Sequence, residues 1–367
     1  GIDLTGNTLA MTTIKTGAGK DSLTLLATTK ATVDTSAGND TVTLGSNVAV
    51  GSTINLGAGD DTLLDSGFSV TPSSASAVTT IDGGAGIDSV SASLINAANA
   101  AQFKNFESLD LYAATSATGL DVELMTASTV TGLTLSGNGA KGAATVTNVA
   151  AGVGLNISGI FTTPNAILTT IGVKGAATGT KDSFAITFNS TSTGTASSAT
   201  PIDAGRVVVN EIENVTIDSN AAAGVAKNSI ILIDNKLETL SIDGSQDLTV
   251  TFGAATGAVT ATGGGVSSID ASGLTGALTI DMTPTAGTFN IAAVGLTVKG
   301  GSGDDKITTS AAGGTLTGGA GKDTFNVSAA EAGAAFGTTP IITTITDLSA
   351  GDSIEFGTAS TAGFKEV

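Results

Sequence analysis

The stretch Gly300-Gly301-Ser302-Gly303-Asp304-Asp305-Lys306-Ile307-Thr308 recurs eighteen residues later as Gly318-Gly319-Ala320-Gly321-Lys322-Asp323-Thr324-Phe325-Asn326. Both copies have the pattern Gly-Gly-x-Gly-x-Asp-x-apolar-x. The nine residues between them, 309–317, lack the aspartate but keep an apolar residue, Leu316, at the position of Ile307 and Phe325. The repeat is therefore nine residues long, and two repeats make one full turn of a coiled chain.

Each position of this nonapeptide has a physical role. Glycine reaches backbone angles that cost other residues a steric clash, so Gly300, Gly301 and Gly303 allow a tight turn whose carbonyl oxygens point to one place. The aspartate adds negative charge there, and the apolar eighth residue points inward from a short strand. Stacked loops of this pattern offer carbonyl and carboxylate oxygens, the ligands that calcium takes in groups of about six to eight.

Four further copies lie near the start of the chain. They are Thr16-Gly17-Ala18-Gly19-Lys20-Asp21-Ser22-Leu23, Thr35-Ser36-Ala37-Gly38-Asn39-Asp40-Thr41-Val42, Leu56-Gly57-Ala58-Gly59-Asp60-Asp61-Thr62-Leu63 and Gly83-Gly84-Ala85-Gly86-Ile87-Asp88-Ser89-Val90. Their aspartates are 19, 21 and 27 residues apart, and only the last copy keeps both leading glycines. One Gly-x-Asp would carry little information, because glycine and aspartate are common in ordinary turns. Six copies in one register favour a second coiled segment with insertions between its turns.

The sequence resembles the RTX family of calcium-binding bacterial proteins that are exported by type I secretion. The resemblance rests on the six nonapeptide copies and on residues 345–356, Ile-Thr-Asp-Leu-Ser-Ala-Gly-Asp-Ser-Ile-Glu-Phe, which are similar to the cap after the last RTX loops, with Leu348 where phenylalanine is usual. It implies Ca²⁺ as the ligand and a calcium β-roll at each end of the chain. The implied metal-binding residues are Gly17, Gly19, Asp21, Gly38, Asp40, Gly57, Gly59, Asp61, Gly83, Gly84, Gly86, Asp88, Gly300, Gly301, Gly303, Asp305, Gly318, Gly319, Gly321 and Asp323.

Composition limits the partners and the chemistry of the chain. Acidic residues number 32 and basic residues 14, a net charge of −18, so nucleic acid and anionic membranes would be repelled and cations attracted. Only 13% of residues are charged and 41% are hydrophobic, which is typical of a folded chain. Cysteine and histidine are absent, which excludes disulfides, Ser-His-Asp and Cys-His catalysis, and zinc sites built on those residues. No apolar run of 18 residues occurs, so we expect no membrane span.

The motifs divide the chain into three segments. Residues 1–91 form an N-terminal β-roll, 92–299 a central irregular solenoid with helical and loop insertions, and 300–367 a C-terminal β-roll with its cap. Within 93–106, apolar and alanine residues recur at three- and four-residue steps, which predicts a short helix beside the coil. The segment 105–111 recurs in outline at 211–217, 236–242 and more weakly at 266–269, which predicts a repeated bend into a strand. Chance alternation in a chain rich in threonine, alanine and valine is the alternative.

Aspartate follows a strand-like isoleucine five times in the central segment. The pairs are Ile217-Asp218, Ile233-Asp234, Ile242-Asp243, Ile269-Asp270 and Ile280-Asp281. An aspartate of this kind often accepts a backbone amide in its own turn. A stacked file of carboxylates would repel itself, and bound calcium would relieve the repulsion, so further metal sites are an open alternative.

These patterns predict an all-β, mostly parallel solenoid with calcium β-rolls at both ends. Overall it resembles RTX-type S-layer proteins, in which calcium rolls run into less regular coils. The resemblance implies a structural protein of the bacterial cell surface that assembles with copies of itself into a two-dimensional lattice when calcium is present. The alternative is the calcium-rigidified stalk of a secreted RTX adhesin.

An enzyme is the third function class. A secreted protease or lipase that carries such a roll would need His-Glu-x-x-His or Gly-x-Ser-x-Gly, and neither motif occurs in this sequence. We therefore expect no catalytic residues here. Gly1 opens within strand-like sequence, which indicates a fragment of a longer protein, and we expect the surface anchor in a region outside this chain.

Overall fold

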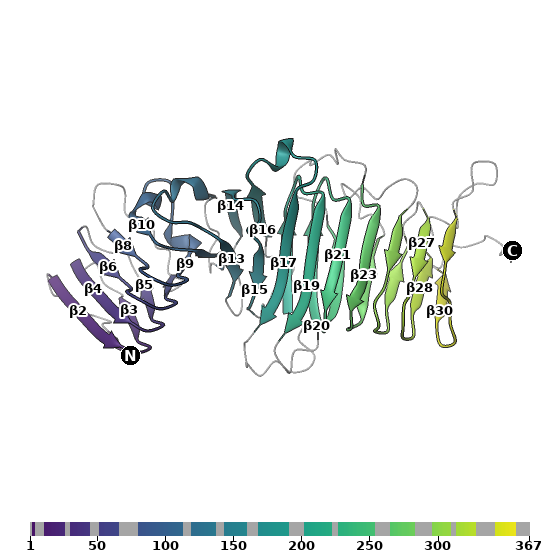
Figure 1. The fold of residues 1–367 in the computed structure, drawn as a ribbon, viewed down its shortest axis with the longest axis horizontal. Coiled ribbons are helices and arrows are strands. Elements are labelled where there is room, and N and C mark those ends of the chain that lie inside the picture. The colour runs from purple at the N-terminus through teal and green to yellow at the C-terminus, as the bar shows by residue number, and fades with distance from the viewer. Residues whose placement is uncertain are drawn as a thin grey trace. The chain divides into compact units, whose positions relative to one another are not determined.

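The computed structural model describes residues 2–3, 11–25, 30–44, 51–65, 80–112, 119–136, 143–159, 168–190, 202–221, 227–253, 265–282, 296–309, 313–327 and 342–356. Contacts divide the chain into two compact units: unit 1 contains residues 1–156 and 161–174, and unit 2 contains residues 157–160 and 175–367. This division differs from the three segments defined by motif, which stay a prediction. Both units consist of short strands stacked side by side (Figure 1).

Unit 1 contains three runs of hydrogen-bonded strands. The odd-numbered strands follow one another in a single sheet: β1 (Ile2–Asp3), β3 (Ser22–Leu25), β5 (Thr41–Leu44), β7 (Thr62–Asp65), β9 (Ser89–Ser91), β11 (Ser108–Asp110), β13 (Gly132–Leu135) and β15 (Leu155–Ile157). A second sheet contains β2 (Met11–Ala18), β4 (Lys30–Ala37), β6 (Thr53–Asn55), β8 (Thr80–Asp82) and β10 (Phe103–Lys104). A third run contains β12 (Leu120–Asp121), β14 (Ala144–Val149) and β16 (Leu168–Val173).

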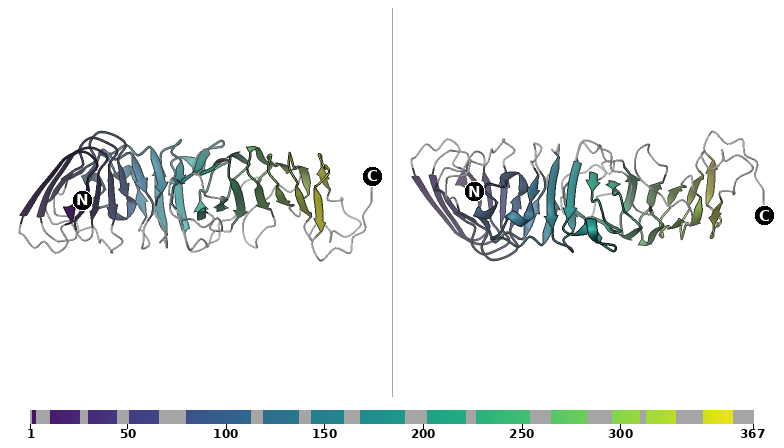
Figure 2. Two further views of the ribbon diagram at one scale, coloured as in Figure 1. Left: turned by 90° about the horizontal axis from the view of Figure 1, so that it is seen from below. Right: turned by 90° about the horizontal axis from the view of Figure 1, so that it is seen from above.

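Unit 2 contains two runs of strands. The odd-numbered run is β17 (Ser183–Ser190), β19 (Asn214–Ala221), β21 (Thr239–Gly244), β23 (Ser268–Leu274), β25 (Thr297–Lys299), β27 (Gly314–Thr317) and β29 (Thr343–Ile345). The even-numbered run is β18 (Ile202–Val208), β20 (Lys227–Ile233), β22 (Asp247–Phe252), β24 (Leu278–Asp281), β26 (Lys306–Thr308), β28 (Thr324–Val327) and β30 (Ser353–Phe356). Strands alternate between the two runs along the chain, and Figure 2 shows the same stacking from two further sides. The all-β parallel solenoid is confirmed.

The eighth residue of each nonapeptide enters the core, as its apolar character predicts. In unit 2, Ile307 of β26 pairs with Phe325 of β28, and Val298 of β25 pairs with Leu316 of β27. All four side chains are buried. The pairing partners are 18 residues apart, so two nonapeptides make one turn, and the degenerate repeat at 309–317 supplies the strand on the other side of the coil.

The N-terminal copies stack in the same way despite their unequal spacing. Leu23 of β3, Val42 of β5, Leu63 of β7 and Val90 of β9 are paired in register, and each is at most 1% exposed. The extra residues of the longer turns therefore lie between strands and leave the register intact.

The helix predicted at 93–106 is replaced by two single turns of 3₁₀ helix, η1 (Ala92–Leu94) and η2 (Ala100–Gln102), followed by β10. Side chains compete with the helical hydrogen bonds between them. The Asn96 carboxamide oxygen accepts the amide of Ala98 at 2.8 Å, and the Asn99 carboxamide accepts the amide of Asn96 at 2.7 Å. Asparagine satisfies the backbone locally in this way and favours turns over a continuous helix. The described residues contain two further 3₁₀ turns, η3 (Val122–Leu124) and η5 (Ala176–Thr178).

The recurring bend in the central segment is a structural repeat. Val215 of β19, Leu240 of β21 and Ile269 of β23 occupy one row of the sheet, at the corresponding position of each copy. In unit 1, Leu109 of β11 pairs with Val90, the eighth residue of a nonapeptide. The bend at 105–109 therefore replaces a nonapeptide loop in the stack. Across the described parts of both units, no helix is long and apolar enough to cross a membrane.

The buried eighth residue should carry much of the stability of each turn. Phe325 is fully buried between two coils, so Phe325→Ala should lower the free energy of unfolding by about 3–5 kcal/mol through lost burial and a cavity. Denaturant unfolding followed by circular dichroism measures this loss. Ile87 is 65% exposed, and Ile87→Ala should change stability by less than about 0.5 kcal/mol. Equal losses in the two variants would contradict the assignment of the core.

Candidate cation-binding loops

The structure gathers the predicted aspartates into two stacks. Those of unit 1, which we call the N-terminal aspartate ladder, are Asp21, Asp40, Asp61 and Asp88, and each stands directly before an odd-numbered strand. Those of unit 2 are Asp305 and Asp323, directly before the even-numbered strands β26 and β28. The sequence pattern predicted the stacks but not that the two would precede different sheets.

Successive members of the N-terminal ladder are joined by hydrogen bonds. The backbone amide of Asp21 donates to Oδ1 of Asp40 at 2.8 Å, that of Asp40 to Oδ1 of Asp61 at 2.7 Å, and that of Asp61 to Oδ1 of Asp88 at 2.8 Å. Glu107 ends the series, because its Oε2 accepts the amide of Asp88 at 3.0 Å. Each carboxylate thus holds the preceding turn in place along the stack.

Unit 2 repeats the arrangement. The amide of Leu278 donates to Oδ1 of Asp305 at 2.7 Å, that of Asp305 to Oδ1 of Asp323 at 2.9 Å, and that of Asp323 to Oδ1 of Asp352 at 2.9 Å. We call Asp305, Asp323 and Asp352 the C-terminal aspartate ladder. Its last member comes from the capping segment, where Asp347 also accepts the amides of the two leading glycines of the last loop at 2.8 Å each.

The second carboxylate oxygens distinguish the ladder from ordinary turn capping. The Oδ2 atoms of Asp40, Asp61 and Asp88 are buried and have no hydrogen-bond partner among the described residues. These three side chains are at most 1% exposed. A buried oxygen of this kind costs about 1–3 kcal/mol, more when charged, and a water molecule or an ion beside it removes that cost.

The ladders are also electrically uncompensated. Among the described residues, no ammonium or guanidinium group forms an ion pair with any of the six nonapeptide aspartates. Burial raises the pKa of Asp61, Asp88 and Asp305 to about 6, and repulsion from the neighbouring ladder carboxylate adds to each rise. Burial raises the pKa of Asp323 as well. A bound cation would remove this cost.

The glycines of the loops are needed for close approach between turns. Gly57 and Gly84 have φ angles of +102° and +104°, and a Cβ atom on either would overlap a carbonyl oxygen of the preceding turn. The same overlap is found for Gly38, Gly59, Gly86, Gly319 and Gly321, whereas Gly83, Gly300, Gly301, Gly303 and Gly318 meet backbone or ladder aspartate atoms. Gly17 and Gly19, in the first copy, have open space. Except in the first copy, the loops therefore bring backbone atoms of adjacent turns, and in part the ladder aspartates, close together.

Three residues that the pattern treats as variable brace the loops. Each stands directly before a ladder aspartate. Asn39 accepts the amide of Asp60 at 3.1 Å, Asp60 accepts that of Ile87 at 2.9 Å, and Asp304 accepts that of Lys322 at 2.8 Å. Their role could have been predicted from the sequence, because Asn or Asp is frequent at this position of the nonapeptide. Glu107 and Asp352 were missed because Asn105 and Ala350 stand two residues before them, where the nonapeptide has its third glycine.

The central Ile-Asp aspartates do not form one file. Only Asp218 and Asp243 are paired in register, on β19 and β21. Burial, and then repulsion from Asp243, raise the pKa of Asp218. Asp270 instead forms an ion pair with Lys299 at 2.9 Å, and its pKa falls to about 2, first through the Ser272 hydroxyl and then through Lys299.

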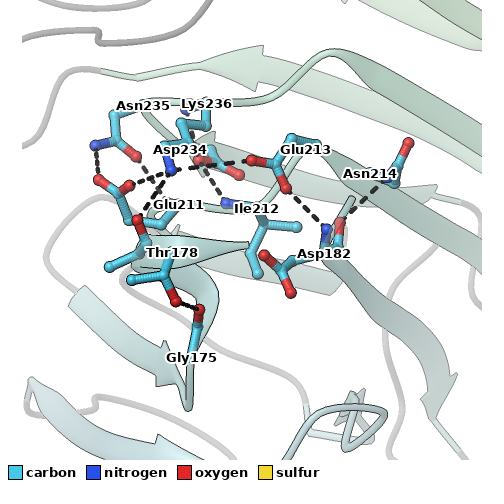
Figure 3. Close-up of polar contacts among 11 residues, drawn as sticks. Gly175, Thr178, Asp182, Glu211, Ile212, Glu213, Asn214, Asp234, Asn235 and Lys236 are labelled. Carbon is cyan, nitrogen blue, oxygen red and sulfur yellow. Dashed lines mark hydrogen bonds and ion pairs between the residues drawn. The ribbon is translucent and has the colours of Figure 1, made fainter. Parts of the chain in front are cut away.

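Asp234 is the one buried carboxyl group among the five Ile-Asp aspartates, and Figure 3 shows it beside Ile212 and Lys236. It is 4% exposed, its Oδ1 accepts the amides of Lys236 at 3.0 Å and Ile212 at 3.4 Å, and its Oδ2 has no partner among the described residues. Burial raises its pKa to about 8. The group is therefore largely protonated at neutral pH, and the neutral acid removes the need for a counter-ion.

The donor set of the glycine loops fits a hard cation. In the described parts of the chain, no three acidic side chains gather into an all-carboxylate metal centre. A cation in these loops would therefore draw on the ladder carboxylates together with backbone carbonyl oxygens. Calcium accepts such a mixed, all-oxygen set, whereas zinc and copper prefer nitrogen or sulfur ligands.

A Cβ atom in a loop should break the stack. Gly57→Ala should lower the free energy of unfolding by about 2 kcal/mol or more, because the new methyl group must push aside the Ser36 carbonyl from a backbone at positive φ. Thermal and denaturant unfolding measure the loss. Gly132 in β13 has nothing within 4 Å of a Cβ atom, and Gly132→Ala is the matched control, which should be close to neutral. A neutral Gly57→Ala would show that the turns do not approach as closely as described.

The protonated Asp234 predicts a distinct pH dependence. Because its folded pKa of about 8 lies above the value of 3.8 for the free side chain, its contribution to stability is complete below about pH 4 and is lost as pH rises through about 8. Asp234→Asn should therefore be more stable than the parent chain above pH 8, by a few kcal/mol in order of magnitude. Unfolding at a series of pH values in chelator gives the difference curve.

Asp270→Asn is the control with the opposite sign. The folded pKa of Asp270 lies below its ordinary value, so its contribution to stability is present above about pH 4 and is lost as pH falls through about 2. This variant should lose stability at neutral pH. If both substitutions shifted stability in the same direction with pH, the assignment of Asp234 as a neutral acid would be wrong.

The chain was compared with protein families and with curated proteins. No family model matches the chain, and no curated protein matches it.

Proposed function

We propose that the glycine loops of both units bind calcium and that the chain is a calcium-stiffened structural protein. The observation that carries this proposal is the row of buried, unpartnered Oδ2 atoms of Asp40, Asp61 and Asp88 beside close-packed backbone carbonyls. Each of these three carboxylates is placed so that one oxygen can fix the neighbouring turn, and the other oxygen is left for a cation. In the C-terminal ladder, Oδ2 of Asp305 also accepts the amide of Gly301 at 2.6 Å.

The residues that would hold calcium are those of the loops already described. In unit 1 these are the ladder aspartates with the glycine-rich backbone at 16–21, 35–40, 56–61 and 83–88, and in unit 2 the loops at 300–305 and 318–323 with Asp347 and Asp352 of the cap. Calcium would supply positive charge between successive turns. Because such a site exists only when the turns are stacked, the binding free energy would be folding free energy.

The proposed role is mechanical. The chain repeats the same acidic loop along each unit and has a net charge of −18, so copies of it repel one another unless cations lie between them. Calcium would both stiffen each coil and reduce that repulsion. Together with the resemblance to RTX-type S-layer proteins, this supports a secreted cell-surface protein that assembles into a two-dimensional lattice in calcium.

Calcium binding is tested by removing charge from one loop at a time. Asp61→Asn keeps an oxygen for the amide of Asp40 but removes the charge, so it should lower the calcium affinity of the N-terminal loops by about tenfold or more. Equilibrium dialysis or calorimetry measures the affinity, and melting in chelator against millimolar calcium measures the coupled stability. Glu123→Gln, in unit 1 outside the glycine loops and paired with Lys174, is the control and should leave the affinity unchanged. A melting temperature that is the same in chelator and in millimolar calcium would contradict the proposal.

Assembly is a separate outcome. With calcium the protein should form open, extending sheets visible by electron microscopy, and these should disperse when chelator is added. A closed ring or small oligomer would contradict a lattice, because closed symmetry stops growth. A monodisperse monomer at high protein concentration, with calcium bound, would favour the adhesin-stalk alternative.

A further inference from the structure

A further copy of the nonapeptide, without its glycines, lies at 177–184 in unit 2. Its sequence Lys181-Asp182-Ser183-Phe184 corresponds to Lys322-Asp323-Thr324-Phe325 in the last glycine loop. Alanine and two threonines, at 177, 178 and 180, stand at the three glycine positions. The 3₁₀ turn η5 provides the reversal that glycine provides elsewhere.

The backbone places Asp182 in the same role as a ladder aspartate. Its carbonyl accepts the amide of Asn214 at 3.0 Å, as that of Asp305 accepts the amide of Thr324 at 2.7 Å. Its amide donates to Oε2 of Glu213 at 2.8 Å. The same bond joins Asp88 to Glu107 in unit 1 at 3.0 Å. Phe184 is buried at the eighth position, as Phe325 is.

The carboxylate of Asp182 also shares the property that marks the cation loops. Its Oδ2 is buried and has no hydrogen-bond partner among the described residues. Glu213, the next acid in the stack, is 5% exposed, and Glu211 lies two residues before it. Three acidic groups thus surround this loop, and Asp234 beside them is largely protonated. A positive charge beside the loop would offset the repulsion among these acidic groups.

In this loop the positive charge is present in the protein itself (Figure 3). The Lys236 ammonium lies 2.8 Å from Oε2 of Glu211 and 4.0 Å from Oε1 of Glu213, and it donates to the carbonyl of Ala177 at 3.5 Å. Ala177 stands where the first glycine of the repeat stands, five residues before the aspartate. The six nonapeptide aspartates have no such ion pair within the described residues.

We propose that the ammonium group of Lys236 takes, in the loop at 177–184, the place that a bound cation takes in the glycine loops. It contacts a loop carbonyl and the carboxylates of the next turn. A lysine ammonium is a compact point charge with three donors, and here its side chain is 19% exposed. The lysine contacts stand on their own, whereas the comparison with a cation rests on the proposed calcium function. This turn of unit 2 then needs no metal.

The test replaces the ammonium group with an apolar end of similar length. In chelator, Lys236→Met should lower the melting temperature of the full chain by roughly 3–8 °C, because acids in a largely buried turn lose the cation that pairs with them. In saturating calcium the variant should bind one more ion per chain than the parent, and the loss in melting temperature should shrink. Equilibrium dialysis with radioactive calcium counts the ions.

Two matched variants separate charge from position. Lys181 is exposed and lies in the same loop, so Lys181→Met makes the same change in net charge without removing the contact, and it should alter neither the ion count nor the melting temperature. Lys236→Arg keeps a positive charge and should bind no additional ion. A variant that combines Lys236→Met with Glu211→Gln and Glu213→Gln should regain stability in chelator, also without an additional ion.

Each of these measurements supports or contradicts the role proposed for Lys236. An unchanged melting temperature in chelator, or an ion count equal to that of the parent chain, would overturn the inference, as would equal effects of Lys236→Met and Lys181→Met. If Lys236→Met does not fold in chelator, its folding on addition of calcium is the expected result, and failure to fold in calcium would overturn it. If the parent chain binds no calcium, the proposed function fails, while the chelator comparison with the triple variant still tests the lysine.

Discussion

In a parallel coil every residue stacks on its equivalent in the next turn, and in this protein one of the stacked residues is an aspartate. The stack has a favourable part, since each carboxylate accepts the amide of its neighbour at 2.7–2.9 Å in both ladders. It also has an unfavourable part, because buried charges of one sign lie in a row. The other interactions in each unit must offset the repulsion among these carboxylates.

The chain meets this constraint in different ways at different turns. Asp234 is buried so deeply that it keeps its proton, with a pKa of about 8. Asp270 lies nearer the surface and pairs with Lys299. In our proposals, Lys236 compensates the turn at 177–184 and calcium compensates the glycine loops. A lysine is fixed by the sequence, whereas a proton and a metal ion both make the stability of a turn depend on the solution outside.

The period, the parallel coil and the buried eighth residue could be predicted because they depend only on spacing. Leu23 and Phe325 occupy equivalent inward positions whatever the length of the insertions between turns. The side of the coil on which each ladder stands depends on how many strands each insertion contributes, which spacing alone does not fix. Glu107 and Asp352 were missed for a different reason, since neither has the glycine two residues before it that marks the nonapeptide. The predicted helix at 93–106 failed for a local reason, since Asn96 and Asn99 satisfy the backbone themselves.

The positions of the glycines distinguish two requirements: the conformation of the turn and the close approach of adjacent turns. Asn105 and Glu211 both adopt positive φ, at +54° and +70°, two residues before their ladder acid, where the nonapeptide has its third glycine. The turn itself can therefore form without glycine, at a modest cost in strain. Glycine is required where carbonyl oxygens of adjacent turns come too close for a Cβ atom, as at Gly59 and Gly86. In the loop at 177–184, where Lys236 contacts a loop carbonyl and the carboxylates of the next turn, the three repeat glycines are absent. In our proposals that lysine takes the place of a metal ion, and the loops that keep their glycines take a cation from solution.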